Sequence, residues 1–362
     1  MLASQGTARR CVGRCVGVSF MALAMVALVM IAGAASGRAA DAPVQLKLSH
    51  WVPPSHPLQT AIEDWAADIK AQSGGSISAT IFPAEQLGKA FDHYDMARDG
   101  IADAAYVSPG YQPGRFPVIS LSDLPFNYSD GKAGTAAVDS WYRKYAAREM
   151  KDVHYCFAFI QDPGTLFSKT RVTVPTDIKG LKIRPANASI GGFVTVLGGN
   201  NVQASAPQSR DLLERGVADG IFFPWGSTVL FGIDKAIRYA INAQFYASTF
   251  VWVLNKDKYE AMSPAQRVVI DNHCNTEWAV RFASPWVDFE AAGRDKIRAE
   301  PGHEVVDLTA AQLDQWRVAA APLRDNWVAG VRRTGGDPDA IATEFVAALT
   351  AQHAAEQSSA RR

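Results

Sequence analysis

The sequence predicts an α/β protein with two lobes, and three observations lead to this prediction. Short apolar strands alternate with helical segments, which is the order typical of sheets covered by helices. This alternation runs over residues 44–160 and starts again over residues 181–254. The chain has 362 residues, of which 48% are hydrophobic and 20% charged, and this length and composition suit two globular cores.

The first unit opens with alternating residues at 44–48, the pattern of a half-buried strand. Apolar residues then recur at helical spacing until Gly74-Gly75, which ends this helix. They are Leu58, Ile62, Trp65 and Ile69. The other elements expected here are strands at 77–82, 102–107 and 153–160 and helices at 91–97 and 135–150. Because strands and helices alternate, a parallel sheet is favoured.

The second unit repeats this order with shorter elements. We expect strands at 181–184, 218–223 and 249–254, and helices at 190–197 and 209–215 that glycines end. A long helix follows from Ser263-Pro264, a good helix start, to Pro301-Gly302, and Pro285 kinks or splits it. If continuous, it measures roughly 50 Å at 1.5 Å per residue, so we expect it to run across both lobes. Helices at 310–333 and 338–355 and a polar tail at 356–362 close the chain.

The N-terminal segment has the order of a secretory signal peptide. Arg9, Arg10 and Arg14 precede an uncharged apolar run over residues 16–35, and small residues follow before Asp41. The alternative is a transmembrane anchor, since about 20 apolar residues can span a bilayer. We predict that residues 1–40 are a cleaved signal peptide and that the mature protein is exported.

The charge of the mature chain excludes one class of function. The four arginines of residues 1–40 leave with the signal, so 32 basic and 36 acidic side chains remain. A mildly acidic chain lacks the cationic footprint on which nucleic-acid affinity rests. We therefore expect no nucleic-acid partner.

Two cysteines remain after the signal, Cys156 and Cys274. They could pair in an oxidising compartment. We favour the interpretation that both are buried free thiols, because the sequence gives no distance between them.

Motifs for catalysis and metal binding are missing from the sequence. It contains no HExxH, GxSxG, Walker loop or GxGxxG pattern. We therefore expect a protein without catalytic residues, a metal site or a cofactor. A cation that bridges ligand and protein stays open, because oxygen ligands leave little sequence signature.

Arg184 is the first candidate binding residue. It ends an apolar strand and precedes Pro185, which cannot continue a central strand. Side chains at the carboxyl ends of strands face the crevice where α/β sheets bind ligands. A guanidinium can hold a carboxylate through two parallel hydrogen bonds. A surface or interdomain salt bridge is the alternative.

Aromatic residues supply the second set of candidates. Phe222-Phe223-Pro224-Trp225 ends a strand of the second unit, Trp51 follows the first strand and Tyr111 the third. Aromatic walls with few polar groups are typical of sites for small organic ligands. Core packing is the alternative and is favoured for Phe222, whereas we expect Trp225 to face a cleft.

Several motifs in this order resemble a known family. They are Leu46-Lys47-Leu48-Ser49-His50, Phe82-Pro83 with Gln86-Leu87-Gly88, Ser108-Pro109-Gly110-Tyr111, Leu124-Pro125-Phe126, the run Asp177-Ile178-Lys179-Gly180-Leu181-Lys182-Ile183-Arg184, and Gly216-Val217-Ala218-Asp219-Gly220. With the export signal and the long helix, the chain resembles the DctP-like solute-binding subunit of TRAP (tripartite ATP-independent periplasmic) transporters. The resemblance covers residues 45–350.

The resemblance implies a two-lobed, periplasmic-binding-protein-like fold with hinge strands. Such a protein closes on one small organic acid in the periplasm, performs no catalysis, and delivers the solute to small and large membrane subunits of a sodium-driven permease. The lobes would comprise residues 41–162 with about 248–288, and 163–247 with about 289–355. The binding residues would be Trp51, Ser108 and Tyr111 in the first lobe and Arg184, Arg210, Phe223 and Trp225 in the second, with Arg184 as the carboxylate anchor.

Departures from the family pattern narrow the expected ligand. The stretch 161–165 has no arginine where many members have one, Phe223 and Pro224 replace a polar Asn, and Arg210 replaces a Tyr. One cationic group with aromatic walls predicts a monocarboxylate with an apolar or aromatic body. A sensory receptor and, less favoured, a periplasmic enzyme on the same frame are the alternative functions.

Overall fold

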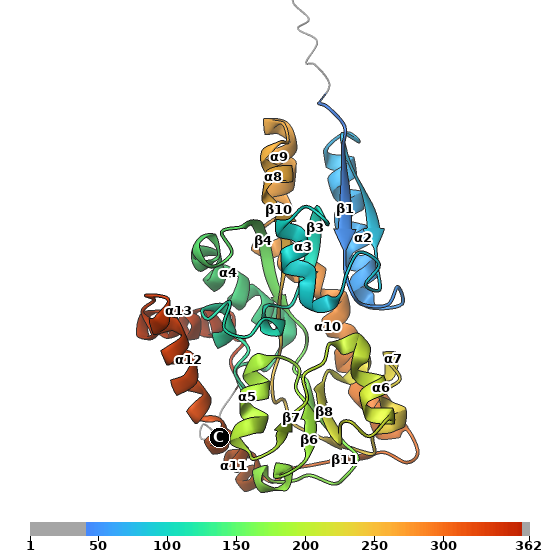
Figure 1. The fold of residues 1–362 in the computed structure, drawn as a ribbon, viewed down its shortest axis with the longest axis vertical. Coiled ribbons are helices and arrows are strands. Elements are labelled where there is room, and N and C mark those ends of the chain that lie inside the picture. The colour runs from blue at the N-terminus through green and yellow to red at the C-terminus, as the bar shows by residue number, and fades with distance from the viewer. Residues whose placement is uncertain (1–40, 357–362) are drawn as a thin grey trace, which may run out of the picture. The chain divides into compact units, whose positions relative to one another are not determined.

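Two mixed β-sheets with helices packed against them make up residues 41–356, the part of the chain that the computed structural model describes (Figure 1). The predicted signal peptide lies outside these residues. Residues from Ala42 onward form one unit by their contacts. No helix among residues 41–356 has the length and apolar character needed to cross a bilayer.

The first sheet has the strand order β2-β1-β3-β10-β4. Its strands are β1 (Val44–Ser49), β2 (Ile77–Phe82), β3 (Ala104–Val107), β4 (Val153–Ile160) and β10 (Thr249–Asn255). β1 pairs in parallel with β2 and β3, as expected, but β10 is antiparallel to both β3 and β4. The parallel arrangement expected for the strands of the first unit is therefore found, and the antiparallel β10 enters this sheet when the chain returns from the second sheet.

The second sheet has the order β11-β9-β5-β8-β6-β7. Its strands are β5 (Thr165–Ser168), β6 (Lys182–Arg184), β7 (Asn200–Asn201), β8 (Gly220–Phe223), β9 (Tyr239–Ile241) and β11 (Glu304–Val306). β5 is antiparallel to β8 and β9, while β6 is parallel to β7 and β8. The sequence analysis missed β5, β7, β9 and β11, since strands of two to four residues are too short to show a period.

The helices follow the apolar periodicity and caps of the sequence. They are α2 (Pro57–Gln72), α3 (His93–Arg98), α4 (Gly131–Glu149), α5 (Ala188–Val196), α6 (Ser209–Glu214), α7 (Trp225–Leu230), α8 (Lys256–Glu260), α9 (Pro264–Asn272), α10 (Thr276–Ala299), α11 (Ala310–Ala320), α12 (Pro322–Arg333) and α13 (Pro338–Ala351). In α2 the expected stripe, Leu58, Ile62, Trp65 and Ile69, is buried.

The long helix is split at residues 273–275, not at Pro285. α9 begins at the predicted Ser263 cap and ends at Asn272, and α10 then runs through Pro285 to Ala299. The side chain of Asn275 caps α10 by accepting a hydrogen bond from the backbone N–H of Trp278 at 2.9 Å. α10 contacts α2 and α4 beside the first sheet and α7 and β11 beside the second, so it spans both lobes as expected.

The chain crosses between the two sheets through residues 161–164 and 242–248. These segments pair with each other: the N–H of Gly164 donates to the carbonyl of Tyr246 at 2.8 Å, and the N–H of Phe245 donates to the carbonyl of Gly164 at 3.0 Å. Together they form the narrow, two-stranded connection expected of a hinge.

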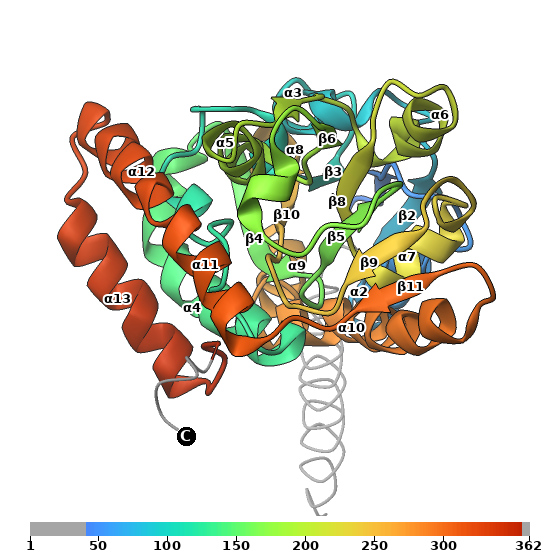
Figure 2. The same cartoon turned by 90° about the horizontal axis from the view of Figure 1, so that it is seen from below.

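The C-terminal helices contact both lobes. α11 and α12 contact α5 beside the second sheet, and α13 packs on α4 beside the first. Figure 2 shows these helices in succession along one side of the unit. The lobe boundaries expected from the sequence stay a prediction. That prediction assigns residues 338–351 to the second lobe, whereas α13 packs against α4, a helix beside the first sheet.

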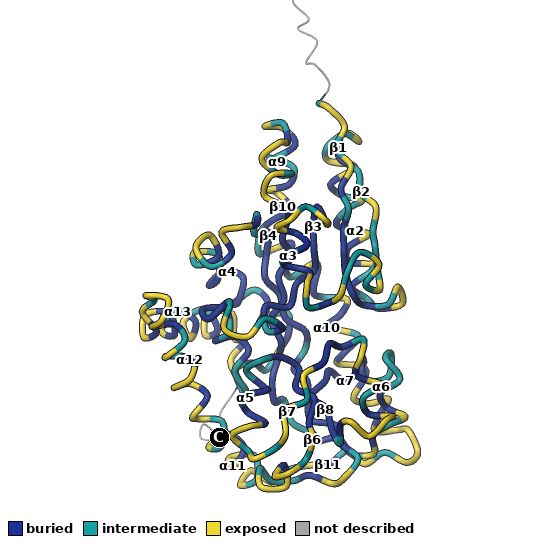
Figure 3. The backbone as a smooth tube through the Cα atoms, in the orientation of Figure 1, coloured by how far each residue is buried: buried dark blue, intermediate teal, exposed yellow. Residues whose placement is uncertain are grey.

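The core is aromatic and continuous across the lobes. One cluster of buried side chains includes Leu46 and Trp65 of the first lobe as well as Ile221 and Phe223 of the second. The buried strands form the dark interior of Figure 3, while much of the outer helix surface is exposed. Contrary to the favoured interpretation of two free thiols, Cys156 and Cys274 form a disulfide that ties β4 to the start of α10.

Candidate functional site

A cavity of about 390 Å³ lies between the two sheets, next to the crossing segments. The first lobe contributes residues of the β1–α2 loop, the turn after β3, β10 and α10, and the second lobe contributes residues around β6, β8 and α7. It is lined by Trp51, Val52, His56, Tyr111, Gln161, Arg184, Ala186, Ala206, Phe223, Pro224, Ser227, Phe231, Tyr246, Ser248, Phe250 and Trp286.

Arg184 supplies the positive charge of this cavity. Its side chain is only 1% exposed because β6 is a central strand that ends against the cavity. Its Nε donates to the carbonyl of Ala204 at 3.0 Å, and its Nη2 donates to the hydroxyl of Tyr111 at 3.1 Å. The guanidinium also lies 5.6 Å from the ring centre of Phe223.

No carboxylate neutralises this guanidinium within residues 41–356, where Arg184 is in no salt bridge. The lining residues include no Asp, Glu or Lys. A buried cation without a counter-ion is costly, because burial removes its hydration. An anion that enters the cavity would supply the missing charge.

Further hydrogen-bond donors surround the same space. The side-chain carbonyl oxygen of Gln161 accepts a hydrogen bond from the backbone N–H of Ser248 at 3.1 Å. The side-chain amide nitrogen of Gln161 takes no part in this bond. The hydroxyl of Tyr246 and the indole N–H of Trp51 are buried and unpaired in the described part of the chain. These two donors are sealed in this conformation, so a ligand would reach them only if the surrounding side chains moved.

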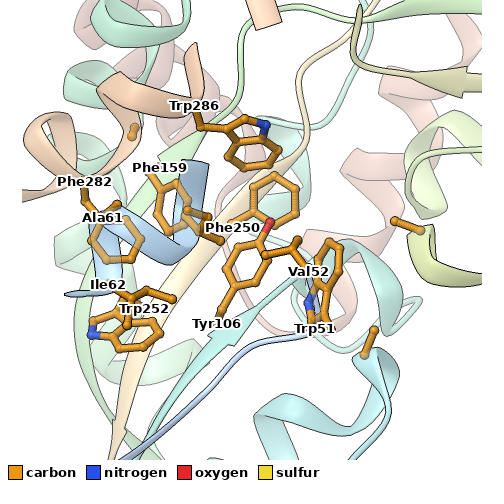
Figure 4. Packing of buried hydrophobic residues seen from close by; sticks show 14 of the residues in the cluster. Trp51, Val52, Ala61, Ile62, Tyr106, Phe159, Phe250, Trp252, Phe282 and Trp286 are labelled. Carbon is orange, nitrogen blue, oxygen red and sulfur yellow. The ribbon is translucent and has the colours of Figure 1, made fainter. Parts of the chain in front are cut away.

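The remaining walls are aromatic. Trp51 stacks on Tyr106 with ring centres 4.8 Å apart, and Phe250 lies 5.0 Å from Tyr106 and 5.1 Å from Trp286. Figure 4 shows Phe250 between Tyr106 and Trp286, with Trp51 next to Tyr106. Such walls offer a flat apolar ligand dispersion contacts and ring stacking.

One acidic group lies behind the wall. Glu290 of α10 accepts hydrogen bonds from the backbone N–H and hydroxyl of Ser227 and from the indole N–H of Trp286. Burial raises the pKa of Glu290 to about 7. This carboxyl fixes the positions of two lining side chains without lining the cavity itself.

Four of the seven predicted site residues line the cavity: Trp51, Tyr111, Arg184 and Phe223. The other three do not. Trp225 is the first residue of α7 and packs against Phe167 at 5.1 Å instead. The hydroxyl of Ser108 is buried and unpaired outside the lining, and Arg210 lies on the surface of α6 in an ion pair with Glu214 at 2.7 Å.

Sequence reasoning missed several lining residues. Gln161, Tyr246 and Ser248 belong to the crossing segments, where no periodicity marks an inward face. His56 is the N-cap of α2, a position that the following Pro57 could have signalled. Within residues 41–356, no group of three His, Cys, Asp or Glu side chains could hold a metal ion.

Comparison with known proteins assigns the chain to a family. The family model for DctP, bacterial extracellular solute-binding protein, family 7, matches residues 48–330. The chain belongs to this family. The expected recognition as a DctP-like TRAP solute-binding protein and the expected two-lobed α/β fold are thereby confirmed.

Solved structures resemble this family 7 protein over most of its length. A TRAP solute-binding protein from Rhodoferax ferrireducens, in complex with copurified benzoate, has a TM-score of 0.81 and 27% identity and covers 86% of this chain and 98% of its own. A TRAP periplasmic solute-binding protein from Bordetella bronchiseptica with bound (R)- and (S)-mandelate has a TM-score of 0.80 and 28% identity and covers 85% of this chain and 99% of its own.

Curated relatives match over shorter stretches. The 2,3-diketo-L-gulonate-binding periplasmic protein of Escherichia coli is 26% identical over 211 residues, which are 54% of this chain and 61% of that protein. A solute-binding protein of Roseobacter denitrificans is 24% identical over 208 residues, again 54% of this chain and 61% of that protein. This family 7 chain therefore spans about three fifths of the length of these two relatives.

Proposed function

We propose that this protein captures an aromatic monocarboxylate in the periplasm and delivers it to the sodium-driven membrane permease of a TRAP transporter. The single observation that carries the proposal is the buried guanidinium of Arg184, which has no acidic partner among residues 41–356 and faces an aromatic cavity. A carboxylate would pair with Arg184, and a ring would contact Trp51, Phe223 and Phe250.

The absence of a second cationic side chain in the lining favours one carboxylate over two. A dicarboxylate would bring a second charge into an aromatic wall, where nothing would replace its hydration. The structural relatives that were solved with benzoate and mandelate are consistent with this ligand class. The protein would bind its ligand without catalysis and without a resident cofactor, and export would depend on the predicted signal peptide.

A thermal-shift screen of the mature chain tests this proposal. The protein is first unfolded and refolded to remove any copurified ligand, and then melted with aromatic monocarboxylates, aliphatic monocarboxylates, dicarboxylates and sugar acids. A ligand at one hundred times its Kd stabilises the folded state by about 2.7 kcal/mol, so benzoate or mandelate should raise Tm by several degrees. The proposal would be contradicted if only dicarboxylates raised Tm, or if none of the organic acids raised it.

A further inference from the structure

His56 is another polar group of the cavity, and the proposed function does not explain its role. Its side chain is 2% exposed and lies in the cavity wall, at the N-terminus of α2. Its Nδ1 accepts a hydrogen bond from the backbone N–H of Leu58 at 3.1 Å, which satisfies a free donor of the helix end.

This contact fixes which ring nitrogen carries the hydrogen. A nitrogen that accepts a hydrogen bond has no hydrogen of its own, so in a neutral imidazole the hydrogen is on Nε2. The ring is neutral at physiological pH because burial lowers the pKa of His56 to about 3. The positive end of the α2 dipole also disfavours a second proton.

Nε2 keeps access to open space. It has no hydrogen-bond partner among the residues that the structure describes. It is also not among their polar atoms that are both unpaired and inaccessible to solvent. The cavity is the open space that this side chain lines. The Nε2–H is therefore a neutral donor that is available to a molecule in the cavity.

The surroundings of His56 separate it from Arg184. The ring of His56 contacts Trp286 at 5.0 Å and Phe231 at 6.4 Å between centres. Arg184 contacts Tyr111, Phe223 and the carbonyl of Ala204. The two sets share no residue, and they meet where Phe231 contacts Phe223 with ring centres 5.7 Å apart.

We propose that the Nε2–H of His56 donates a hydrogen bond to an oxygen on the ligand's ring, so that the preferred ligand is a ring-hydroxylated aromatic monocarboxylate. This inference rests on the proposed function, because it takes the carboxylate on Arg184 as given. An unsubstituted ring would leave the Nε2–H unpaired in an apolar wall, and leaving a buried donor unpaired weakens binding.

Calorimetry with benzoate and its 2-, 3- and 4-hydroxy derivatives tests the assignment. A neutral hydrogen bond contributes about 1 kcal/mol, so the best hydroxybenzoate should bind the wild-type protein about fivefold more tightly than benzoate. Two variants separate the functions of the ring. His56→Asn keeps an acceptor for Leu58 but is too short to place a donor at Nε2, whereas His56→Gln places an amide N–H there and loses the cap.

His56→Asn should melt close to the wild-type Tm and lose the preference, with the affinity ratio falling to about one. His56→Gln should melt lower, because a lost N-cap is destabilising, and should keep the preference. The matched control is His50→Asn, since His50 is also a buried histidine but does not line the cavity; it should keep the preference.

Two results overturn the assignment and differ in meaning. If benzoate binds and no hydroxybenzoate binds more tightly, or if His56→Asn keeps the preference, the role of His56 is wrong while the proposed function stands. If no aromatic acid binds the wild-type protein, both are wrong.

Discussion

At the scale of single residues, the unusual feature is a guanidinium buried without a carboxylate. Most buried ions in proteins are paired, since desolvation is otherwise too costly. Arg184 instead has two neutral partners, the carbonyl of Ala204 and the hydroxyl of Tyr111. The interdomain salt bridge considered from the sequence is not formed among residues 41–356. The residue is thus arranged to receive an anion.

Replacing Arg184 should therefore reduce affinity more than stability. Arg184→Ala should weaken binding of an aromatic acid by at least about tenfold, because a charge-assisted hydrogen bond contributes roughly 1.5–3 kcal/mol. Arg184→Lys should restore part of the loss, since an ammonium keeps the charge but not the planar fork. Calorimetry alongside melting curves separates affinity from stability. An Arg184→Ala protein that binds like wild type would exclude the role of anchor.

The sequence allowed prediction of those site residues that a recognisable local pattern marks. Arg184 could be predicted because it ends an apolar strand before a proline, and Trp51 and Tyr111 because each follows a strand. Gln161 and Ser248 could not, because they meet only when two segments distant in sequence pair with each other. Trp225 was misplaced because α7 begins at that residue, which turns its side chain toward β5.

At the scale of elements, the contact between α7 and α10 holds the second lobe to the long helix. The two helices cross where Gly226 faces Gly293. A Cβ atom added at Gly293 would lie 2.1 Å from the backbone nitrogen of Gly226 and 2.3 Å from its Cα. Backbone atoms cannot move aside like the end of a flexible side chain, so only glycine allows this approach.

Gly293→Ala should therefore destabilise the protein despite the higher helix propensity of alanine. Overpacking of this kind costs roughly 1–3 kcal/mol, which chemical unfolding in urea measures. Gly330→Ala in α12 is the control, because its nearest neighbours would lie 3.7 Å from the new Cβ. That variant should gain up to about 1 kcal/mol from propensity alone. Equal effects of the two substitutions would refute the close crossing as the cause.

Element prediction succeeded for long periodic segments and failed at helix breaks. The start of α9 at Ser263-Pro264 was predicted from its cap. The break at residues 273–275 was missed, although Asn275 is a good N-cap residue, because Pro285 carried the stronger sequence signal. Pro285 is accommodated inside α10, so tertiary packing overrides its local preference there.

At the scale of the whole molecule, two paired segments and one helix connect the sheets. The crossing segments 161–164 and 242–248 hydrogen-bond to each other, and α10 spans both lobes. The disulfide between Cys156 and Cys274 fixes α10 to the first lobe near its start. Movement of the second lobe relative to the first would therefore be concentrated in the crossing segments and in the contacts that close the cavity.

Tyr111 provides the contact that should control this closure. From the first lobe, its hydroxyl accepts hydrogen bonds from Nη2 of Arg184 at 3.1 Å and from the N–H of Ala206 at 3.0 Å, both in the second lobe. A ligand that contacts both lobes favours the closed state, so small-angle scattering should give a smaller radius of gyration with benzoate than without it. Tyr111→Phe removes both bonds and should weaken binding about fivefold to thirtyfold, while the saturated protein reaches the same closed radius. Tyr239→Phe, in β9 of the second sheet and outside the cavity lining, should change neither quantity. Identical wild-type profiles with and without bound ligand would show that the lobes do not move.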